Sequence, residues 1–343
     1  MQVGQTPLPS VRIWGEVLKA EILKMLRESE DYVSGQQISE KFGVSRTAVW
    51  KAINQLKEEG YQVEAVRNRG YQIVSSPDVI TAEELKSQMD TQWAAQQVCY
   101  YEETDSTNIR AKQLGEEGMP HGTLAVADIQ SAGRGRRGRG WETPKGCSIC
   151  MSILLRPEIP PVKAPMLTLV MAQSVAEGIK ESTGVDVQIK WPNDIVLNGK
   201  KLVGILTEMS TEIDYINHVV IGVGINVNME QFPKELSEKA TSLRVELGHP
   251  MKRSPIIAAV MKKFEKNYGL FIEAGDLEPI QDAYNSLLVN QGREVRILGA
   301  KEEYNAFSLG INKEGELLVR KEDGSMEAIF AGEVSVRGIY GYV

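Results

Sequence analysis

The chain has 343 residues and a formal net charge of −7. This length is typical of two or three domains, and the acidic balance argues against a protein wholly devoted to nucleic acid. No apolar run approaches the ~20 residues of a membrane span, and the polar start does not resemble a signal peptide. Three cysteines, Cys99, Cys147 and Cys150, cannot make a disulfide framework and predict a reducing, cytoplasmic location.

Charge is distributed unevenly along this acidic chain. Residues 1–76 carry ten Lys/Arg and nine Asp/Glu, and residues 41–69 carry six basic and three acidic side chains. A locally basic stretch on an acidic protein indicates an anionic partner at one end of the chain. Charge alone would instead favour a solvated helix face, so the choice between an anionic partner and such a face depends on the pattern of predicted helices and strands.

The N-terminal pattern predicts three helices followed by a hairpin. Apolar residues at helical spacing mark the helices, Ser45 can cap the third helix, and Gly60 can end it. Alternating residues mark two strands, with Arg67 and Arg69 at the turn between them. The expected elements are helices at 13–26, 36–42 and 46–59 and strands at 61–66 and 70–74.

This order of elements is typical of a winged helix-turn-helix domain, expected over residues 12–76, with the helix-turn-helix at about 35–54 and the wing at about 61–74. The second helix of the pair enters the major groove, and a basic wing can reach phosphate or the minor groove. A helical hairpin for protein contacts is the weaker alternative, because turn, caps and basic wing tip coincide. The expected DNA-binding residues are Arg46, Thr47, Trp50, Lys51, Asn54, Arg67 and Arg69.

Beyond a linker at Ser75–Asp78, the pattern predicts an α+β domain with a mixed sheet, over residues 80–287. Strands and helices alternate there without regular βαβ repeats. From 288 to 343, short alternating strands punctuated by glycines predict a small β-barrel. The expected central elements are helices at 81–89, 165–182 and 256–271 and strands at 98–101, 122–129, 148–155, 187–190, 195–197, 202–209 and 218–228.

A run of alternating glycines and arginines, Gly133–Trp141, is the clearest functional signal. Gly133, Gly135 and Gly138 formally satisfy the dinucleotide-binding pattern, but that pattern requires a helix after the glycines and none is expected here. A protein-kinase glycine loop is excluded as well, because no catalytic-loop or metal-binding signature follows. Arginine offers bidentate donors to carboxylate and phosphate, and glycine allows close backbone approach. We therefore expect a loop that closes over an anion. A nucleic-acid arm is disfavoured, because the run is short and lies between strands.

Two further clusters accompany this loop. Lys190–Asp194, of sequence Lys-Trp-Pro-Asn-Asp, lies between two strands and could serve a phosphate, a ribose or magnesium, although an ordinary Asx turn explains either polar residue alone. Asp105–Asn108 follows a strand and equally fits a helix N-cap. Cys147 and Cys150 form a C-x-x-C without a second pair, so we interpret them as ordinary strand cysteines rather than a zinc or redox site.

Together these motifs resemble the biotin protein ligases, and with the N-terminal domain they resemble the bifunctional form that is also the biotin operon repressor. The resemblance covers about residues 15–335. It implies a class II synthetase-like central domain and an SH3-like C-terminal barrel. The motifs that carry it are Ser106–Asn108, Gln130–Arg139, Lys190–Asp194, Lys200–Leu206 and Gly222–Asn228.

The resemblance implies an ATP-dependent ligase. Such enzymes join biotin to ATP, with Mg²⁺ assisting, to give biotinyl-5′-adenylate, and pass biotin to a lysine of a biotin carboxyl carrier protein of acetyl-CoA carboxylase or another biotin-dependent carboxylase. No protein nucleophile is needed, because positioning and charge neutralisation suffice. The implied residues are Ser106, Thr107, Asn108, Gln130, Arg134, Gly135, Arg136, Lys201 and Gly204 for biotin; Arg136, Arg139, Lys190, Asn193 and Asn226 for ATP; and Arg136, Lys201 and Lys190 for catalysis.

The resemblance also implies operator DNA as a partner and a homodimer as the repressing form, with no membrane. Two alternatives stay open on the sequence alone. One is a transcription regulator that senses a ligand without ligase activity, and the other is a ligase whose DNA-binding domain is inert. Exposed basic and polar residues on the second helix and the wing favour the bifunctional reading.

Overall fold

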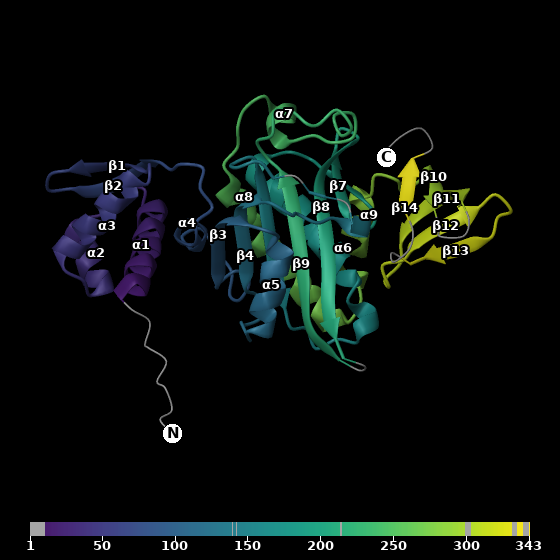
Figure 1. Ribbon diagram of the computed structural model, residues 1–343, viewed down its shortest axis with the longest axis horizontal. Coiled ribbons are helices and arrows are strands. Elements are labelled where there is room, and N and C mark those ends of the chain that lie inside the picture. The colour runs from purple at the N-terminus through teal and green to yellow at the C-terminus, as the bar shows by residue number, and fades with distance from the viewer. Residues whose placement is uncertain are drawn as a thin grey trace, which may run out of the picture. The chain divides into compact units, whose positions relative to one another are not determined.

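The computed structural model describes residues 11–138, 140–141, 143–212, 215–298, 303–330, 335–338 and 343. Contacts within the chain divide it into two compact units, 1–88 and 89–343 (Figure 1). Within the described ranges, no helix is both long enough and apolar enough to cross a membrane.

The N-terminal unit contains the predicted three helices and hairpin. Ser34 caps α2 with a capping box, and the Ser45 side chain caps α3 by accepting from the backbone N–H of Ala48. Between them Gly43 ends α2 in the left-handed conformation, with φ +64°. The elements are α1 (Val11–Glu28), α2 (Gly35–Phe42), α3 (Arg46–Glu58), β1 (Gln62–Val66) and β2 (Gly70–Ser75).

One apolar core holds this unit together. The residues expected on the inner faces of the helices, among them Ile22, Ile38, Val49 and Leu56, are all at most 1% exposed. Burying side chains of this size stabilises a fold by about 1.5–3 kcal/mol each. The same packing leaves the opposite side of α3 free, and that side carries the polar residues predicted to contact DNA.

A short helix, α4 (Ala82–Lys86), also belongs to this unit, so the division after Gln88 lies later than the linker expected at Ser75–Asp78. Glu84 of α4 is 1% exposed and pairs with Arg27 Nη2 of α1 at 2.7 Å. Tyr61 donates its hydroxyl to the same carboxylate. A buried carboxylate needs such partners, and they fix α4 against α1.

The second unit is built on a seven-stranded mixed sheet, as the sequence predicted. Its order is β3-β4-β5-β9-β8-β7-β6, in which β3 and β4 are parallel and every other neighbouring pair is antiparallel. The strands are β3 (Val98–Thr104), β4 (Leu124–Gln130), β5 (Ser148–Leu155), β6 (Gln188–Lys190), β7 (Asp194–Leu197), β8 (Lys200–Thr211) and β9 (Ile216–Asn226).

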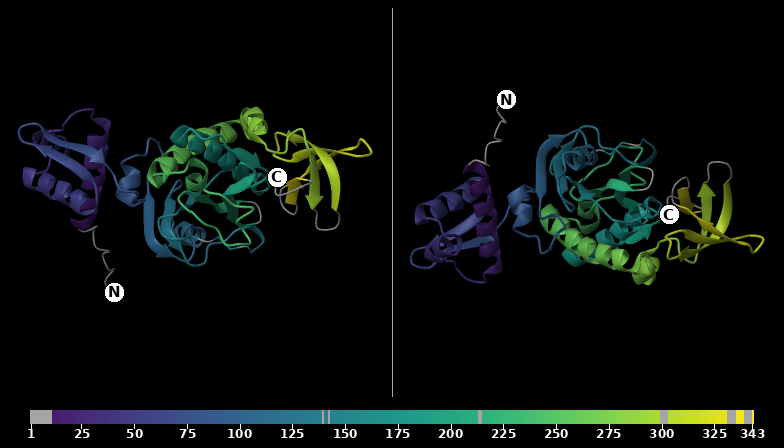
Figure 2. Two further views of the ribbon diagram at one scale, coloured as in Figure 1. Left: turned by 90° about the horizontal axis from the view of Figure 1, so that it is seen from above. Right: turned by 90° about the horizontal axis from the view of Figure 1, so that it is seen from below.

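Helices cover both faces of this sheet (Figures 1 and 2). On β8, Glu208 bonds to Asn108 of α5, whereas the preceding Thr207 bonds to Thr168 of α6. Successive strand residues point to opposite faces, so α5 lies on one face and α6, packed on α8, lies on the other. These helices are α5 (Thr107–Glu116), α6 (Met166–Thr183) and α8 (Arg253–Ala274).

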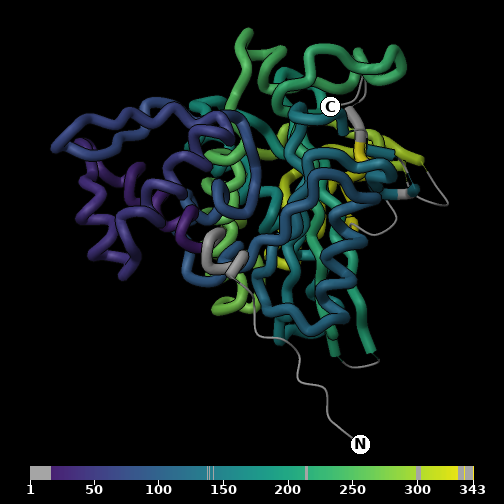
Figure 3. Tube along the Cα trace, turned by 60° about the vertical axis from the view of Figure 1, so that its left-hand side comes forward, coloured from purple at the N-terminus to yellow at the C-terminus, as the bar shows by residue number. Residues whose placement is uncertain are grey.

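Two helices of the unit, α7 (Leu243–Leu247) and α9 (Glu278–Leu287), were not expected from the sequence, and α5 was indicated only by the possible N-cap at Asp105–Asn108. The connection from β9 to α8 carries α7 and rises above one end of the sheet (Figure 3). Two 3-10 turns complete the unit, Arg136–Gly138 in the Gly/Arg loop and Pro161–Lys163 before α6.

The small C-terminal β domain is also confirmed, as a five-stranded antiparallel sheet of order β13-β12-β11-β10-β14. Val295, Ile297 and Val319 are at most 1% exposed and fill its core. The described strands are β10 (Glu294–Leu298), β11 (Glu303–Ile311), β12 (Leu317–Lys321), β13 (Met326–Ile329) and β14 (Ser335–Gly338).

Candidate active site

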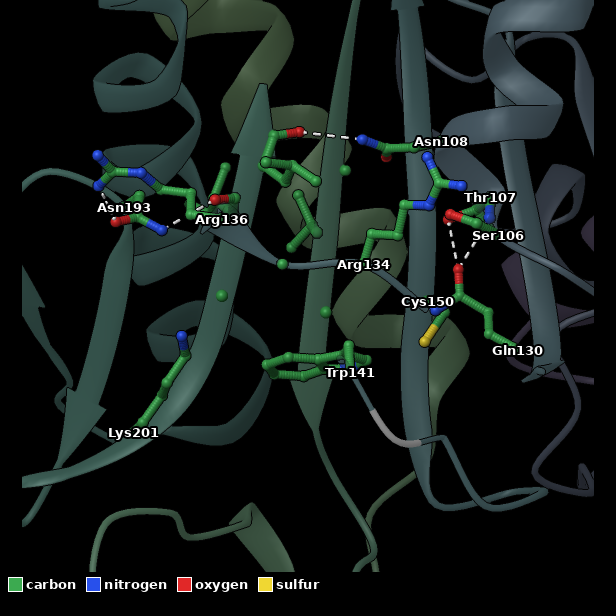
Figure 4. A pocket seen from close by; sticks show the side chains of 17 residues that line it. Ser106, Thr107, Asn108, Gln130, Arg134, Arg136, Trp141, Cys150, Asn193 and Lys201 are labelled. Carbon is green, nitrogen blue, oxygen red and sulfur yellow. Dashed lines mark hydrogen bonds between the residues drawn. The ribbon is translucent and has the colours of Figure 1, made fainter. Parts of the chain in front are cut away.

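A cavity lies on the α5 face of the central sheet, beneath the Gly/Arg loop (Figure 4). The structure brings together here all nine residues predicted for biotin, together with Asn193. The lining is Ser106, Thr107, Asn108, Gln130, Arg134, Gly135, Arg136, Trp141, Cys150, Asn193, Lys201, Gly204, Ile205, Leu206, Gly222, Val223 and Gly224.

Glycines make the floor of this cavity. A Cβ at Gly222 would lie 2.0 Å from Asn108 Oδ1, and one at Gly224 would lie 2.4 Å from Trp141 Cε2. A Cβ at Gly204 would meet Trp141 and Lys201 at 3.1–3.2 Å. Side chains from α5 and from the loop therefore sit directly on the backbone of β8 and β9, which only glycine permits.

One wall of the cavity is polar and uncharged. At the start of α5 the Thr107 N–H donates to Gln130 Oε1 at 2.8 Å, and Asn108 Nδ2 faces Leu206 O at 3.3 Å (Figure 4). Ser106 is the N-cap of α5, as the simplest reading of the motif predicted, yet its side chain makes no capping hydrogen bond. A cap residue that does not cap is consistent with a ligand-binding role for its hydroxyl. We call this the polar wall: Ser106, Thr107, Asn108 and Gln130.

The opposite wall is cationic. Arg136 Nη1 donates to Asn193 Oδ1 at 2.8 Å, which links the Gly/Arg loop to the turn before β7. Lys201 Nζ lies 2.7 Å from Asp194 and 5.8 Å from the centre of the Trp141 ring. We call this the cationic wall: Arg136 and Lys201. The side chain of Arg134 extends instead toward Thr107 and Asn108 of the polar wall (Figure 4). Arg139 falls outside the described residues.

The Gly/Arg loop returns on itself above the cavity. Arg134 and Gly140 form an isolated antiparallel bridge, and the Trp141 N–H donates to Gly133 O at 3.0 Å. A Cβ at Gly133 would lie 2.4 Å from Trp141 O. The loop is thus a narrow hairpin whose first strand contains Arg134 and whose second strand places Trp141 over the glycine floor.

The turn Lys190–Asp194 is held from behind by the C-terminal domain. Its Trp191–Pro192 bond is cis, and the buried Trp191 donates its indole N–H to Gly315 O at 3.1 Å. Asn193 Nδ2 donates to Ile205 O at 3.0 Å. A second hollow shares Arg136 and Asn193 with the cavity and also touches Phe330.

Two residues predicted for ATP do not line the cavity. Lys190 is 5% exposed on β6, in register with Asp194, and Asn226 is 5% exposed on β9. The Asn226 amide donates to Thr241 O at 3.1 Å, so it holds the connection that carries α7. Spacing along a strand could place both residues near the turn, but it could not show which contacts would bury them.

The sequence missed several residues of the cavity. The sequence gives Trp141 no role although it ends the Gly/Arg loop. It also marks Gly222 and Gly224 only as part of a motif, without indicating that they form the floor of the cavity. Cys150 is a strand cysteine, as predicted, but it also lines the cavity, and burial raises the pKa of its thiol to about 11. Cys147 lies in the turn before β5 rather than in the strand, which corrects that detail.

The N-terminal unit carries the predicted DNA-binding residues on two elements, α3 and the wing formed by β1 and β2. Arg46, Thr47, Trp50 and Lys51 of α3 are exposed, as are the wing residues, whereas Asn54 is half-buried. At the wing, Arg69 pairs with Asp31 at 2.7 Å and stacks over Tyr32 at 4.4 Å. Arg46 donates to Gln36 at 2.7 Å. Both arginines are thus oriented by neighbours, and Arg67 is exposed at the turn.

Three protein-family models match the chain. The biotin/lipoate A/B protein ligase family matches residues 100–226, an HTH domain matches 19–72, and the biotin protein ligase C terminal domain matches 292–337. Every residue that lines the cavity falls inside the ligase match.

The chain is 39% identical over 322 residues to the bifunctional ligase/repressor BirA of Bacillus subtilis (strain 168), which covers 93% of this chain and 98% of that protein. The chain belongs to the bifunctional ligase/repressor family of biotin protein ligases. It is also 31% identical to the bifunctional ligase/repressor BirA of Escherichia coli (strain K12), over 92% of this chain and 96% of that one.

Solved biotin protein ligases share the fold of the second unit. The biotin protein ligase from Aquifex aeolicus, in complex with biotin and ATP, superposes with a TM-score of 0.63 at 31% identity, over 71% of this chain and 99% of that one. The bifunctional ligase/repressor described here adds the helix-turn-helix unit to that ligase body.

Proposed function

We propose that the chain catalyses two successive transfers in this one cavity. A biotin carboxylate oxygen attacks the α-phosphorus of ATP, a P–O bond forms, and pyrophosphate leaves. A lysine amine of a biotin carboxyl carrier protein then attacks the acyl carbon, loses a proton, and displaces AMP. The observation that carries this proposal is a single cavity with a polar wall for a neutral ring and a cationic wall for carboxylate and phosphate.

The residue roles follow from this division. The polar wall takes the urea ring of biotin, with Ser106, Thr107, Asn108 and Gln130. The biotin carboxylate lies between Arg134, Gly135 and Arg136 and near Lys201, with the Gly204 backbone beside it. Charge neutralisation of two approaching anions is the main catalytic effect, and Arg136 and Lys201 supply it.

We place ATP against Arg136, Arg139 and Asn193. Lys190 and Asn226 are buried and do not line the cavity. We therefore assign them an indirect role, in which Lys190 supports the turn and Asn226 supports the α7 connection. Mg²⁺ supplies charge neutralisation when it is bound to ATP. Since the carboxylate of the turn, Asp194, already pairs with Lys201, we place Mg²⁺ on the phosphate oxygens and assign it no protein ligand.

The ligase proposal is tested by labelling an acceptor. Purified protein with biotin, ATP and an isolated biotin carboxyl carrier domain should attach biotin to one lysine of that domain. Omission of ATP or replacement of the lysine by arginine should abolish the label. Labelling that proceeds without ATP would contradict the proposal.

We further propose that the N-terminal unit binds operator DNA as part of a cytoplasmic homodimer, with the adenylate as corepressor. Support comes from the exposed basic face of α3 and from the wing. By linkage, a ligand that favours the dimer also favours binding to two half-sites. A gel shift on operator DNA should tighten when biotin and ATP are added together, and an unchanged shift would indicate an inert DNA-binding domain.

A further inference from the structure

Lys201 points into the cavity from a strand position that should face the other way. Gly204 of β8 lines the cavity, and successive residues of a regular strand point to opposite faces of a sheet. Three positions before Gly204, Lys201 should therefore face α6. Instead, a Cβ at Gly204 would lie 3.2 Å from Lys201 Nζ, and Asp194, directly opposite Gly204 on β7, pairs with the same Nζ at 2.7 Å. Lys201 thus shares the cavity face (Figure 4).

A β-bulge directly after Lys201 accounts for this reversal. Ile195 of β7 pairs with Val203, and the next residue of β7 pairs with Lys201. Two steps along β8 therefore correspond to one step along β7, and Leu202 is the extra residue. An extra residue inverts the alternation of side chains between the two sides of the bulge. The bulge is thus what brings the ammonium group to the cavity face.

The α7 connection holds the bulge at the other edge of β8. Pairing between β8 and β9 begins at Val203, and the backbone of Lys201 bonds to the connection instead. The Lys201 N–H donates to Lys239 O at 2.7 Å, and the Thr241 N–H donates to Lys201 O at 2.9 Å. These two bonds make an isolated parallel bridge between Lys201 and Ala240. The backbone of Lys201 is therefore fixed between β7 and this connection.

Thr241 is the centre of this support. It is 1% exposed, and besides its bond to Lys201 its carbonyl accepts from Asn226 Nδ2 at 3.1 Å. Its hydroxyl donates to Glu246 of α7. The second oxygen of Glu246 accepts from Asn198, in the turn between β7 and β8. One half-buried carboxylate therefore ties the connection to the turn that leads into the bulge.

We propose that Thr241 and Glu246 are positioning residues for Lys201, which hold the bulge that turns its ammonium group into the cavity. This inference rests on the proposed function, under which Lys201 lies near the biotin carboxylate. A bulge disrupts the strand ladder locally, so the direction of a side chain beside it depends on other contacts. Neither Thr241 nor Glu246 lines the cavity, and both act through the backbone of Lys201.

The test compares biotin with biotinol, in which a neutral hydroxyl group replaces the carboxylate. Of the two ligands, biotin alone can form an ion pair with Lys201. Calorimetry on the full chain should show that Glu246→Ala weakens biotin binding by about 5- to 10-fold and biotinol binding by less than about twofold. Thr241→Val replaces the hydroxyl by a methyl group and keeps the backbone bonds. It should weaken biotin binding by about threefold, again with little effect on biotinol.

Two further variants separate positioning from packing. In the Lys201→Ala background, Glu246→Ala should cause no further loss of biotin binding, because both substitutions act through one ammonium group. Glu246→Gln keeps an acceptor for the Thr241 hydroxyl, and the exposed Asn198 amide can turn to accept from the new Nε2. It should therefore bind both ligands as the wild type does.

Glu230→Ala is the matched control in the same connection. Glu230 pairs with Arg244 at 2.6 Å, and both side chains are exposed. An exposed pair of this kind contributes little, and it bonds to neither the bulge nor the turn. Binding of biotin and of biotinol should both be unchanged.

The outcomes distinguish this inference from the proposed function. Equal weakening of biotin and biotinol in Glu246→Ala, or wild-type binding of both, would overturn the positioning role although the ligase reading stands. If Glu246→Ala does not fold, the same comparison in Thr241→Val decides. Failure of the wild type to release pyrophosphate from ATP in the presence of biotin would instead overturn the proposed function, and it is read from a different measurement.

Discussion

The two walls of the cavity are built on opposite principles. Thr107, Asn108 and Gln130 of the polar wall have hydrogen-bond partners within the protein, so their side chains are oriented before a ligand arrives. The charges of the cationic wall are held by side chains of other elements, Arg136 by Asn193 and Lys201 by Asp194. A ligand anion must compete with these contacts. We therefore expect ligand selectivity to depend on the polar wall and charge neutralisation to depend on the cationic wall.

The largest effect should come from removing a charge of the cationic wall. Arg136→Ala should lower the rate of adenylate formation by about 100-fold or more, because a donor aimed at developing charge is lost. Biotin affinity should fall much less. Pyrophosphate release under single-turnover conditions measures the first effect, and calorimetry measures the second.

Lys145→Ala is the matched control for that variant. Lys145 follows the Gly/Arg loop, but it is 61% exposed and pairs with the exposed Glu102. Exposed pairs of this kind contribute about 0–1 kcal/mol, so both activity and stability should be unchanged. Equal losses in the two variants would mean that the loop acts only through its overall charge.

The next effect should come from the floor that the two walls share. Gly224→Ala would place a Cβ 2.4 Å from Trp141 Cε2 and push the indole off the floor. We expect about tenfold weaker biotin binding and a stability loss of about 1–3 kcal/mol from overpacking. Gly269→Ala in α8 is the control, because nothing lies within 4 Å of its Cβ, and helical Gly→Ala is neutral or stabilising.

A smaller effect should show that the C-terminal domain supports the cationic wall. Trp191→Phe removes the indole N–H that donates to Gly315 O, a bond of about 1 kcal/mol. The KM for ATP should rise by about 3- to 5-fold, while the KM for biotin should rise less, because the polar wall that binds the biotin ring does not depend on this turn. An equal rise in both KM values would argue that the two walls are not independent.

The smallest effect on catalysis should come from the other unit. Lys51→Ala on α3 should weaken binding to operator DNA and reduce the slope of log K against log salt by about 1. Adenylate formation should be unaffected. Lys234→Ala, an exposed cation outside the N-terminal unit, should leave that slope unchanged, and a change there would mean that DNA contacts extend beyond the winged helix.

The sequence predicted the features that depend on local signals and missed those that depend on long-range contacts. Local signals were sufficient for α3 with its cap at Ser45, for the mostly apolar strand β5, and for the Gly/Arg loop. They were insufficient wherever a long-range contact decides. The ion pair of Arg27 with Glu84 assigns α4 to the first unit, and the bond of Asn226 to Thr241 O takes that amide out of the cavity.

The polar wall shows the same limit. Ser106–Asn108 could be recognised as a motif, but Ser152 and Glu208, which bond to Asn108, lie 44 and 100 residues further along the chain than Asn108. Nothing in their neighbourhoods marks them, because Ser152 stands in an apolar strand and Glu208 in an alternating one. Only the register of β5, β8 and β9 beneath α5 brings them under the site.

The central claim is that one cavity forms an acyl adenylate and retains it until an acceptor arrives. The most direct test mixes the wild-type chain with biotin and labelled ATP without acceptor, and follows pyrophosphate against protein concentration. The account predicts a rapid burst equal to the protein concentration, dependent on biotin, after which release nearly stops because the adenylate stays bound. Continuous release at the initial rate, or release without biotin, would contradict it.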